Sequence, residues 1–154
     1  DDGTVYVTSG YRGNRLAAID LSAAEGDITG SDAILWSLDR DTPYVPSPLL
    51  HDGIIYLVKS NDGILSSYDA GTGERVWGPE RIRALRGVYA SPVSASGRIY
   101  VPGRQGTTVV LQAGETFEVL ATNELDDGFD ASPVVVGDEL YLRGREFLYA
   151  IAEE

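Results

Sequence analysis

Histidine and cysteine, which often act as catalytic bases and nucleophiles, are scarce or absent in this chain, and the position of the one histidine argues against catalysis. His51 is the only histidine, and there is no cysteine. It stands in the segment His51-Asp52-Gly53, and an Asp-Gly pair between apolar runs is typical of a hairpin turn. A catalytic triad needs its histidine in a pocket beside a nucleophile. We therefore interpret His51 as a turn residue.

A second candidate site is the acidic cluster of Asp126, Asp127 and Asp130. Carboxylate oxygens are the ligands that calcium prefers in proteins. Acidic residues beside a glycine are also typical of a solvated turn, and we favour that interpretation. The sequence contains no phosphate-binding glycine loop, HExxH motif or EF-hand loop. We therefore predict no metal site.

The composition fits one globular domain. Of 154 residues, 43% are hydrophobic and 23% charged, which is ordinary for a folded chain, and 18 glycines indicate many tight turns. The lack of cysteine excludes disulfide scaffolds and thiolate metal sites. A formal net charge of −12 repels nucleic acid and anionic membranes, and no apolar stretch reaches the roughly 20 residues of a membrane span. We predict neither a nucleic-acid partner nor a membrane span.

Ser-Pro pairs recur along the chain and reveal an internal repeat. The pairs Ser47-Pro48, Ser91-Pro92 and Ser132-Pro133 are 44 and 41 residues apart. An apolar run, a turn with glycine and a tyrosine follow each pair. These tyrosines are Tyr56, Tyr100 and Tyr141, and an earlier copy without its Ser-Pro pair contains Tyr6. A fixed period of this length indicates a repeat architecture.

Each repeat holds four short runs rich in valine, isoleucine, leucine and tyrosine, separated by turn residues. Four antiparallel strands in this length are typical of one β-propeller blade. With strands labelled A to D, the chain reads BCD, ABCD, ABCD and ABC, or fourteen strands in about 3.5 to 4 blades. We therefore expect an all-β fold, a single propeller segment over residues 1–154. Its repeats are expected at residues 1–40, 41–83, 84–125 and 126–154.

Two repeats close on a tryptophan, Trp36 and Trp77, and the second contains the segment Tyr-Asp-Ala-Gly-Thr-Gly-Glu at residues 68–74. With the Ala-Ser-Pro segment at residues 90–92 and the Gly-x-x-Tyr pattern, these features resemble the pyrroloquinoline-quinone (PQQ) enzyme repeat. The third repeat departs from it, with Gln112 at the aspartate position and no tryptophan. The resemblance implies that both tryptophans pack between neighbouring blades. We assign structural roles to Trp36, Trp77, Asp20, Asp69, Pro48, Pro92 and Pro133.

Proteins with this repeat include quinoprotein dehydrogenases and non-catalytic propellers such as the lipoprotein of the outer-membrane β-barrel assembly machinery. The resemblance implies, for the catalytic members, an aspartate base, calcium and often a vicinal disulfide. This chain has no cysteine, and no base or calcium ligand maps onto it. We therefore expect a non-catalytic scaffold or binding module without a cofactor, in the bacterial periplasm or outside the cell. Two alternatives stay open: the C-terminal part of a PQQ-dependent dehydrogenase, with PQQ and calcium, and the sensor domain of a membrane kinase.

A blade is stable when neighbours cover both of its faces, and the predicted arc has two open ends. About six apolar side chains per face, at ~1.5 kcal/mol each, leave ~9 kcal/mol of burial unrealised at each end. That amount is comparable to the stability of a whole domain. We expect that the remaining blades of a longer propeller cover the open ends, or that copies of the chain associate through them.

Basic residues gather on one predicted rim. In a four-stranded meander, the B–C and D–A turns share a rim, and ten of the 12 basic residues but only nine of the 24 acids fall there. Arginine pairs with carboxylates and is enriched at interfaces. We predict a rim site for a protein partner or a small anionic ligand, formed by Arg12, Tyr44, Arg83, Arg86, Tyr89, Arg104, Phe129, Asp130, Arg143 and Arg145. The alternative is that these arginines and aspartates pair with one another across adjacent loops, at 0 to ~1 kcal/mol per pair.

Overall fold

The chain folds into four separate antiparallel sheets, which we call blades 1 to 4. The computed structural model describes residues 2–10 and 14–152. Blade 1 contains β1 (Thr4–Ser9), β2 (Arg15–Asp20) and β3 (Ile34–Leu38). Blade 2 contains β4 (Leu49–His51), β5 (Ile54–Val58), β6 (Ile64–Asp69) and β7 (Arg75–Arg81). Blade 3 contains β8 (Val93–Ala95), β9 (Arg98–Pro102), β10 (Thr107–Gln112) and β11 (Val119–Glu124), and blade 4 contains β12 (Val134–Val136), β13 (Glu139–Arg143) and β14 (Leu148–Ala152).

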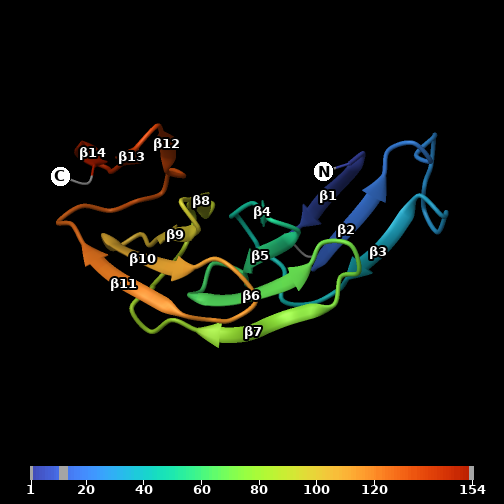
Figure 1. Cartoon of the computed structure of the whole chain (residues 1–154), viewed down its shortest axis with the longest axis horizontal. Coiled ribbons are helices and arrows are strands. Elements are labelled where there is room, and N and C mark those ends of the chain that lie inside the picture. The colour runs from blue at the N-terminus through green and yellow to red at the C-terminus, as the bar shows by residue number, and fades with distance from the viewer. Residues whose placement is uncertain (1, 11–13, 153–154) are drawn as a thin grey trace.

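Every blade is a meander, because strands that follow one another in sequence are hydrogen-bonded neighbours. The short strands β4, β8 and β12 lie innermost, and β8 contacts both of the others. The four blades form an open arc around these strands, with β7 and β11 on its outer side (Figure 1). The predicted all-β propeller fold is confirmed, and the described residues contain the fourteen strands that the repeat predicts. Among these residues there is no helix that could cross a membrane.

The Ser-Pro pairs join adjacent blades. The backbone N–H of Ser47 donates a hydrogen bond of 2.9 Å to the hydroxyl of Ser91, and the N–H of Ser91 donates one of the same length to the hydroxyl of Ser132. Each serine can therefore both donate to the next blade and accept from the previous one. The recurrence in the sequence corresponds to this chain of hydrogen bonds along the inner side of the arc.

Trp36, at the outer strand of blade 1, lies against the turn between β6 and β7 of blade 2. Its indole Nε1 donates to the carbonyl of Ala70 at 2.9 Å, and the Tyr6 hydroxyl donates to the same carbonyl at 3.0 Å. The indole ring also covers Gly73, where a Cβ atom would approach it to 2.7 Å and where φ is +71°. Glycine is thus required there both by the close ring and by the backbone conformation.

The same arrangement joins blade 2 to blade 3. Trp77 Nε1 donates to the carbonyl of Gly114 at 3.2 Å, and the N–H of Gly114 donates to the Tyr56 hydroxyl at 2.9 Å. Trp77 also packs beside Phe117, with ring centroids 5.2 Å apart. Both tryptophans therefore lie between neighbouring blades.

The hydrophobic core lies between blades. One buried cluster joins blades 1 and 2 through Leu16, Ile55, Leu57, Tyr68 and Ala70. A larger one joins blades 2 and 3. As a result, five consecutive residues of β10 are buried, whereas exposed and partly buried residues alternate along β1. The inner blades bury both faces and the end blades only one.

Aspartates stabilise the turns that precede the outermost strand of blades 1 and 2, after β2 and β6. Asp69 Oδ1 accepts hydrogen bonds from the hydroxyl and the N–H of Thr72, at 2.9 and 2.8 Å. Asp20 Oδ1 accepts the equivalent pair from Ser22, at 2.7 and 2.8 Å. In each case the side-chain hydrogen bond is the main cause that lowers the pKa of the carboxyl. His51 ends β4, and the turn itself consists of Asp52 and Gly53, both with positive φ.

Replacing Trp77 with alanine is expected to lower the free energy of unfolding by about 3 to 5 kcal/mol, because it opens a cavity between two blades and removes the hydrogen bond to Gly114. Urea denaturation followed by circular dichroism measures the change. Leu120→Ala, at a largely exposed position of β11, serves as the control and should cost less than ~1 kcal/mol. Equal losses in the two variants would contradict the assigned role of Trp77.

Candidate functional site

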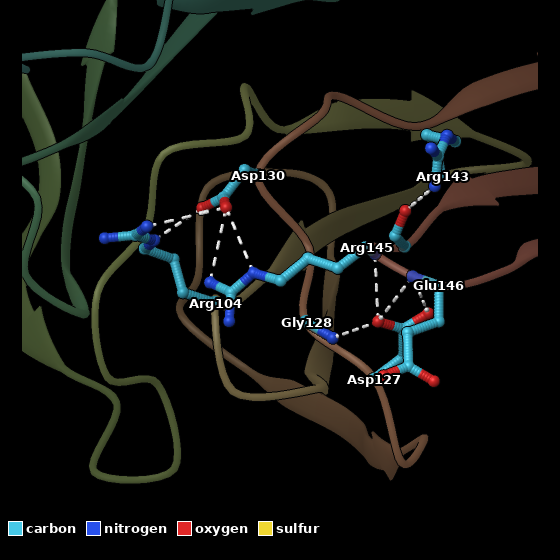
Figure 2. A network of polar contacts seen from close by, with 8 residues as sticks. Arg104, Asp127, Gly128, Asp130, Arg143, Arg145 and Glu146 are labelled. Carbon is cyan, nitrogen blue, oxygen red and sulfur yellow. Dashed lines mark hydrogen bonds and ion pairs between the residues drawn. The ribbon is translucent and has the colours of Figure 1, made fainter.

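Three loops meet on one rim of blades 3 and 4 and form the candidate site. They are the β9–β10 turn (residues 103–106), the β11–β12 loop (125–133) and the β13–β14 turn (144–147). Figure 2 shows that Arg104 comes from the first, Asp127 and Asp130 from the second, and Arg145 from the third. We call these four residues the rim network.

Arg104 is held by two different contacts. Its guanidinium carbon lies 4.1 Å from the ring centroid of Tyr89, within the range of a cation–π interaction. Its Nε and Nη2 atoms donate to the two carboxylate oxygens of Asp130, the second at 3.5 Å. A fork of this kind fixes the guanidinium plane and ties the β9–β10 turn to the loop that leads into blade 4.

Arg145 binds the same carboxylate from the other side. Its Nε and Nη2 atoms lie 3.4 and 3.3 Å from Asp130 Oδ2. Hydrogen bonds from Arg104, and to a lesser extent from Arg145, hold the pKa of Asp130 below its usual value. All three side chains are more than a third exposed, so each pair contributes only about 0 to 1 kcal/mol to stability. Neither arginine uses its Nη1 atom in these contacts.

Asp127 is held mainly by backbone groups. The N–H groups of Arg145 and Phe147 donate to its two carboxylate oxygens at 2.9 and 3.1 Å, and the N–H of Glu146 also donates to them. Burial raises the pKa of Asp127, but hydrogen bonds from the backbone of Gly128, Phe147, Glu146 and Arg145 together lower it below the usual value. The carboxylate thus shapes the β13–β14 turn.

Gly144 makes this contact with Asp127 possible. A Cβ atom at residue 144 would clash with the Asp127 carboxylate, so a side chain there would displace it. The glycine of this turn therefore allows the close approach of an acid 17 residues earlier in the chain.

Phe129, one of the predicted rim residues, lies in the protein interior and not on the rim. We expected Phe129 to be available to a partner, but it is 0% exposed, and its ring packs edge-on against Tyr149 with centroids 5.9 Å apart. Residue 129 also forms an isolated β-bridge with Gly144, which directs the phenylalanine into the interior. Burial of an aromatic ring outweighs exposure on a loop, and Phe129 is a core residue.

The other predicted rim residues vary in exposure. Tyr44, Arg83, Arg86 and Arg143 are exposed, and Tyr89 is partly buried beneath Arg104. Arg143 donates to the carbonyl of Gly144. Arg12 lies outside the described residues. The rim thus brings Tyr89, Arg104, Asp130 and Arg145 together.

Arg83 and Arg86 stand apart from this network in the loop between β7 and β8. Neither forms an ion pair with another described residue. They line a shallow groove of about 610 Å³ whose other wall includes Gln105, Glu124 and Asp126. The sequence left open the alternative that rim arginines simply pair with aspartates across adjacent loops. Arg104 and Arg145 pair in this way, but Arg83 and Arg86 do not.

Asp41 forms a second ion-pair cluster that sequence reasoning missed. Its carboxylate lies 3.0 Å from Lys59 Nζ and 2.9 Å from Arg75 Nη2. Asp41 has a positive φ of 58° and lies in the connection between blades 1 and 2. Because its partners are 18 and 34 residues away, no local pattern could have indicated them.

The tryptophans and the acidic cluster are engaged in contacts within the fold. Both indoles are packed between blades, and their N–H groups are bonded to backbone carbonyls. Within the described ranges, no group of three histidine, cysteine, aspartate or glutamate residues could hold a metal ion. Asp127 is engaged by backbone N–H groups and Asp130 by arginines, which matches the solvated-turn interpretation of the acidic cluster more closely than a cation site.

The sequence model of the family described as outer membrane protein assembly factor BamB matches residues 1–87, more than half of the 154 residues. The chain belongs to this family. Comparison with curated protein sequences gave no match.

Solved structures show the same fold as this BamB-family chain. BamB from Moraxella catarrhalis superposes with a TM-score of 0.71 and 20% identity, over 97% of this chain and 43% of its own. The computationally designed Ika4 protein gives a TM-score of 0.69 and 14% identity, over 99% and 86% of the two chains. A quinohemoprotein alcohol dehydrogenase from Comamonas testosteroni gives 0.68 and 18%, over 93% and 28%. The chain thus spans less than half the length of the natural proteins in this comparison.

In this BamB-family chain, the variant Asp127→Asn is expected to lower stability in a pH-dependent way. Because the folded pKa of Asp127 lies below its unfolded value, the carboxylate stabilises the fold above about pH 4 and loses this effect as the pH falls through the folded pKa. Urea denaturation at pH 7 and at about pH 3 should show a clear difference between wild type and variant at pH 7 that shrinks at pH 3. A difference that stays constant or grows on acidification would contradict the assignment.

Proposed function

We propose that this BamB-family chain is a non-catalytic propeller scaffold that binds a protein partner through its rim. The proposal rests mainly on the rim network, in which polar groups are held in one geometry while they remain accessible. Binding sites that are ordered in advance lose less conformational entropy on association. The family description names an assembly factor, which supports a role in protein–protein association.

The anionic group of such a partner would bind at Arg83 and Arg86. Within the rim network, Asp127 and Asp130 offset the charges of Arg104 and Arg145, so the network has little capacity for a further anion. Arg83 and Arg86 are exposed beside the groove and form no ion pair with another described residue. Two guanidinium groups at one edge suit a carboxylate of an acidic peptide, and the network supplies the rigid wall next to them.

We further propose that the chain acts in the bacterial periplasm or outside the cell and uses no cofactor. The description of its family, which names an outer-membrane protein assembly factor, supports the location. The packing of both tryptophans between blades supports a structural role for them and a chain without that cofactor. The likeness to quinohemoprotein alcohol dehydrogenases, at 18% identity, concerns the fold alone.

The rim proposal predicts that the chain binds a fluorescein-labelled hexaglutamate peptide more tightly than a hexaglutamine peptide at low salt. Arg83→Ser combined with Arg86→Ser should raise the dissociation constant by about tenfold, since exposed ion pairs contribute up to ~1 kcal/mol each. Fluorescence anisotropy measures the binding, and added salt should weaken it.

Arg98→Ser is the control for the single variants Arg83→Ser and Arg86→Ser, because it removes the same charge at the β8–β9 turn of the opposite rim. If Arg98→Ser weakens binding as much as either single variant, net charge and not the groove determines the affinity, and the rim proposal is wrong.

A scaffold role also predicts the outcome of reconstitution. After incubation with PQQ and calcium followed by dialysis, the chain should retain no quinone absorbance and should oxidise neither alcohols nor sugars. Absorbance spectra and a dye-reduction assay test this. Retained quinone together with turnover would overturn the non-catalytic assignment in favour of the dehydrogenase alternative.

A further inference from the structure

The groove beside Arg83 and Arg86 has a basic wall, and the loop that carries this wall is anchored to blade 2. Ile82 and Leu85 of the loop are 7% and 4% exposed and belong to the core cluster that joins blades 2 and 3, whereas both arginines are exposed. The N–H of Ile82 donates to the carbonyl of Gly63 at 2.7 Å, and the N–H of Leu85 donates to the carbonyl of Ile82 at 3.1 Å. Burial of the two apolar side chains thus leaves Arg83 and Arg86 at the surface of a loop with a fixed backbone.

The other wall of the groove is acidic. Glu124, the last residue of β11, and Asp126 both line it and are exposed. Leu125 stands between them in the chain, and its N–H donates to the carbonyl of Gly106 at 3.1 Å. Neither acid forms an ion pair with another described residue. The groove therefore lies between a segment with two arginines and a segment with two carboxylates.

The groove continues along the rim. A second groove, of about 330 Å³, is lined by residues of the rim network and shares Gln105, Leu125 and Asp126 with the first, so the two adjoin. Gln105 is exposed, and its side-chain amide can donate to and accept from a peptide backbone. Two adjoining grooves with an amide between them suit an extended chain better than a single small ion.

The two walls call for opposite charges on the two sides of such a chain. In an extended peptide, successive side chains point to opposite sides. A peptide in which acidic and basic residues alternate therefore presents its carboxylates on one side, toward the arginines, and its ammonium groups on the other, toward Glu124 and Asp126. A purely acidic peptide is attracted by the arginines but repelled by these two carboxylates, because like charges at close range oppose binding.

We propose that the groove binds an extended segment of a partner protein in which acidic and basic residues alternate. This inference rests on the proposed function, because it assigns the sequence pattern of the partner that the rim binds. It adds an attractive role for Glu124 and Asp126, which the binding of a purely acidic peptide does not require.

Fluorescence anisotropy at low salt with fluorescein-labelled, C-terminally amidated hexapeptides tests the pattern. The probes are the alternating peptide EKEKEK, the block peptide EEEKKK of the same composition, and hexaglutamate. We expect the alternating peptide to bind about tenfold more tightly than the block peptide, which is the gain from two additional exposed ion pairs.

A variant of the acidic wall should affect the probes in opposite directions. Glu124→Gln combined with Asp126→Asn should weaken the binding of the alternating peptide about tenfold and tighten the binding of hexaglutamate, because it removes attraction in the first case and repulsion in the second. Glu115→Gln combined with Glu118→Gln is the control. It makes the same change in net charge at exposed positions of the β10–β11 turn, on the opposite rim, and should leave the affinity for the alternating peptide nearly unchanged.

The pattern is wrong if the alternating and block peptides bind the wild-type chain alike, or if the acidic-wall variant weakens the alternating peptide no more than the control does. In that case Arg83→Ser combined with Arg86→Ser still decides the proposed function. Loss of hexaglutamate binding in that variant supports the arginines as an anion site, whereas unchanged binding contradicts both proposals. Circular dichroism checks that each variant is folded, and the comparison of the two peptides on the wild-type chain decides the question even if a variant unfolds.

Discussion

A sheet with two apolar faces needs a neighbour on each side, and this constraint determines most of the structure. The inner blades meet it through the clusters around Leu65 and Leu57, in which consecutive residues of a strand are buried on both faces. The tryptophan contacts and the serine hydrogen bonds then set the spacing between blades. At the ends of the arc no described blade meets this constraint, and Val7 and Leu148 are exposed there.

The rim loops are held mainly by charge and by hydrogen bonds to the backbone, in addition to the buried ring of Phe129. Asp127 accepts hydrogen bonds from the N–H groups of one turn, and Asp130 pairs with two arginines. Such contacts contribute little to overall stability when exposed, but they hold three loops in a constant relation. Loops held in this way suit a scaffold, and Arg83 and Arg86 lie beside them without an ion pair to another described residue.

Sequence reasoning succeeded where the signal was local and repeated. Ser47, Ser91 and Ser132 recur with the period of the blade, and the same N–H to hydroxyl hydrogen bond joins each serine to the next. It was less successful on the loops, where each contact occurs once. Phe129 was expected on the rim but is buried against Tyr149, and the role of Asp41 was missed, because their partners lie 18 or more residues away in the chain. Arg104 and Arg145 were assigned to the correct loops, but residue type alone did not show that both of them pair with Asp130.

The amino-acid sequence alone determined the blade repeat and the fourteen strands. Strand periodicity and turn chemistry are local properties, and a repeat presents them several times over. Only the tertiary structure decided which charged groups neutralise one another and which remain available, and which aromatic rings are buried. Those outcomes depend on distances between loops of different blades, and distances of this kind arise only when the sheets have packed.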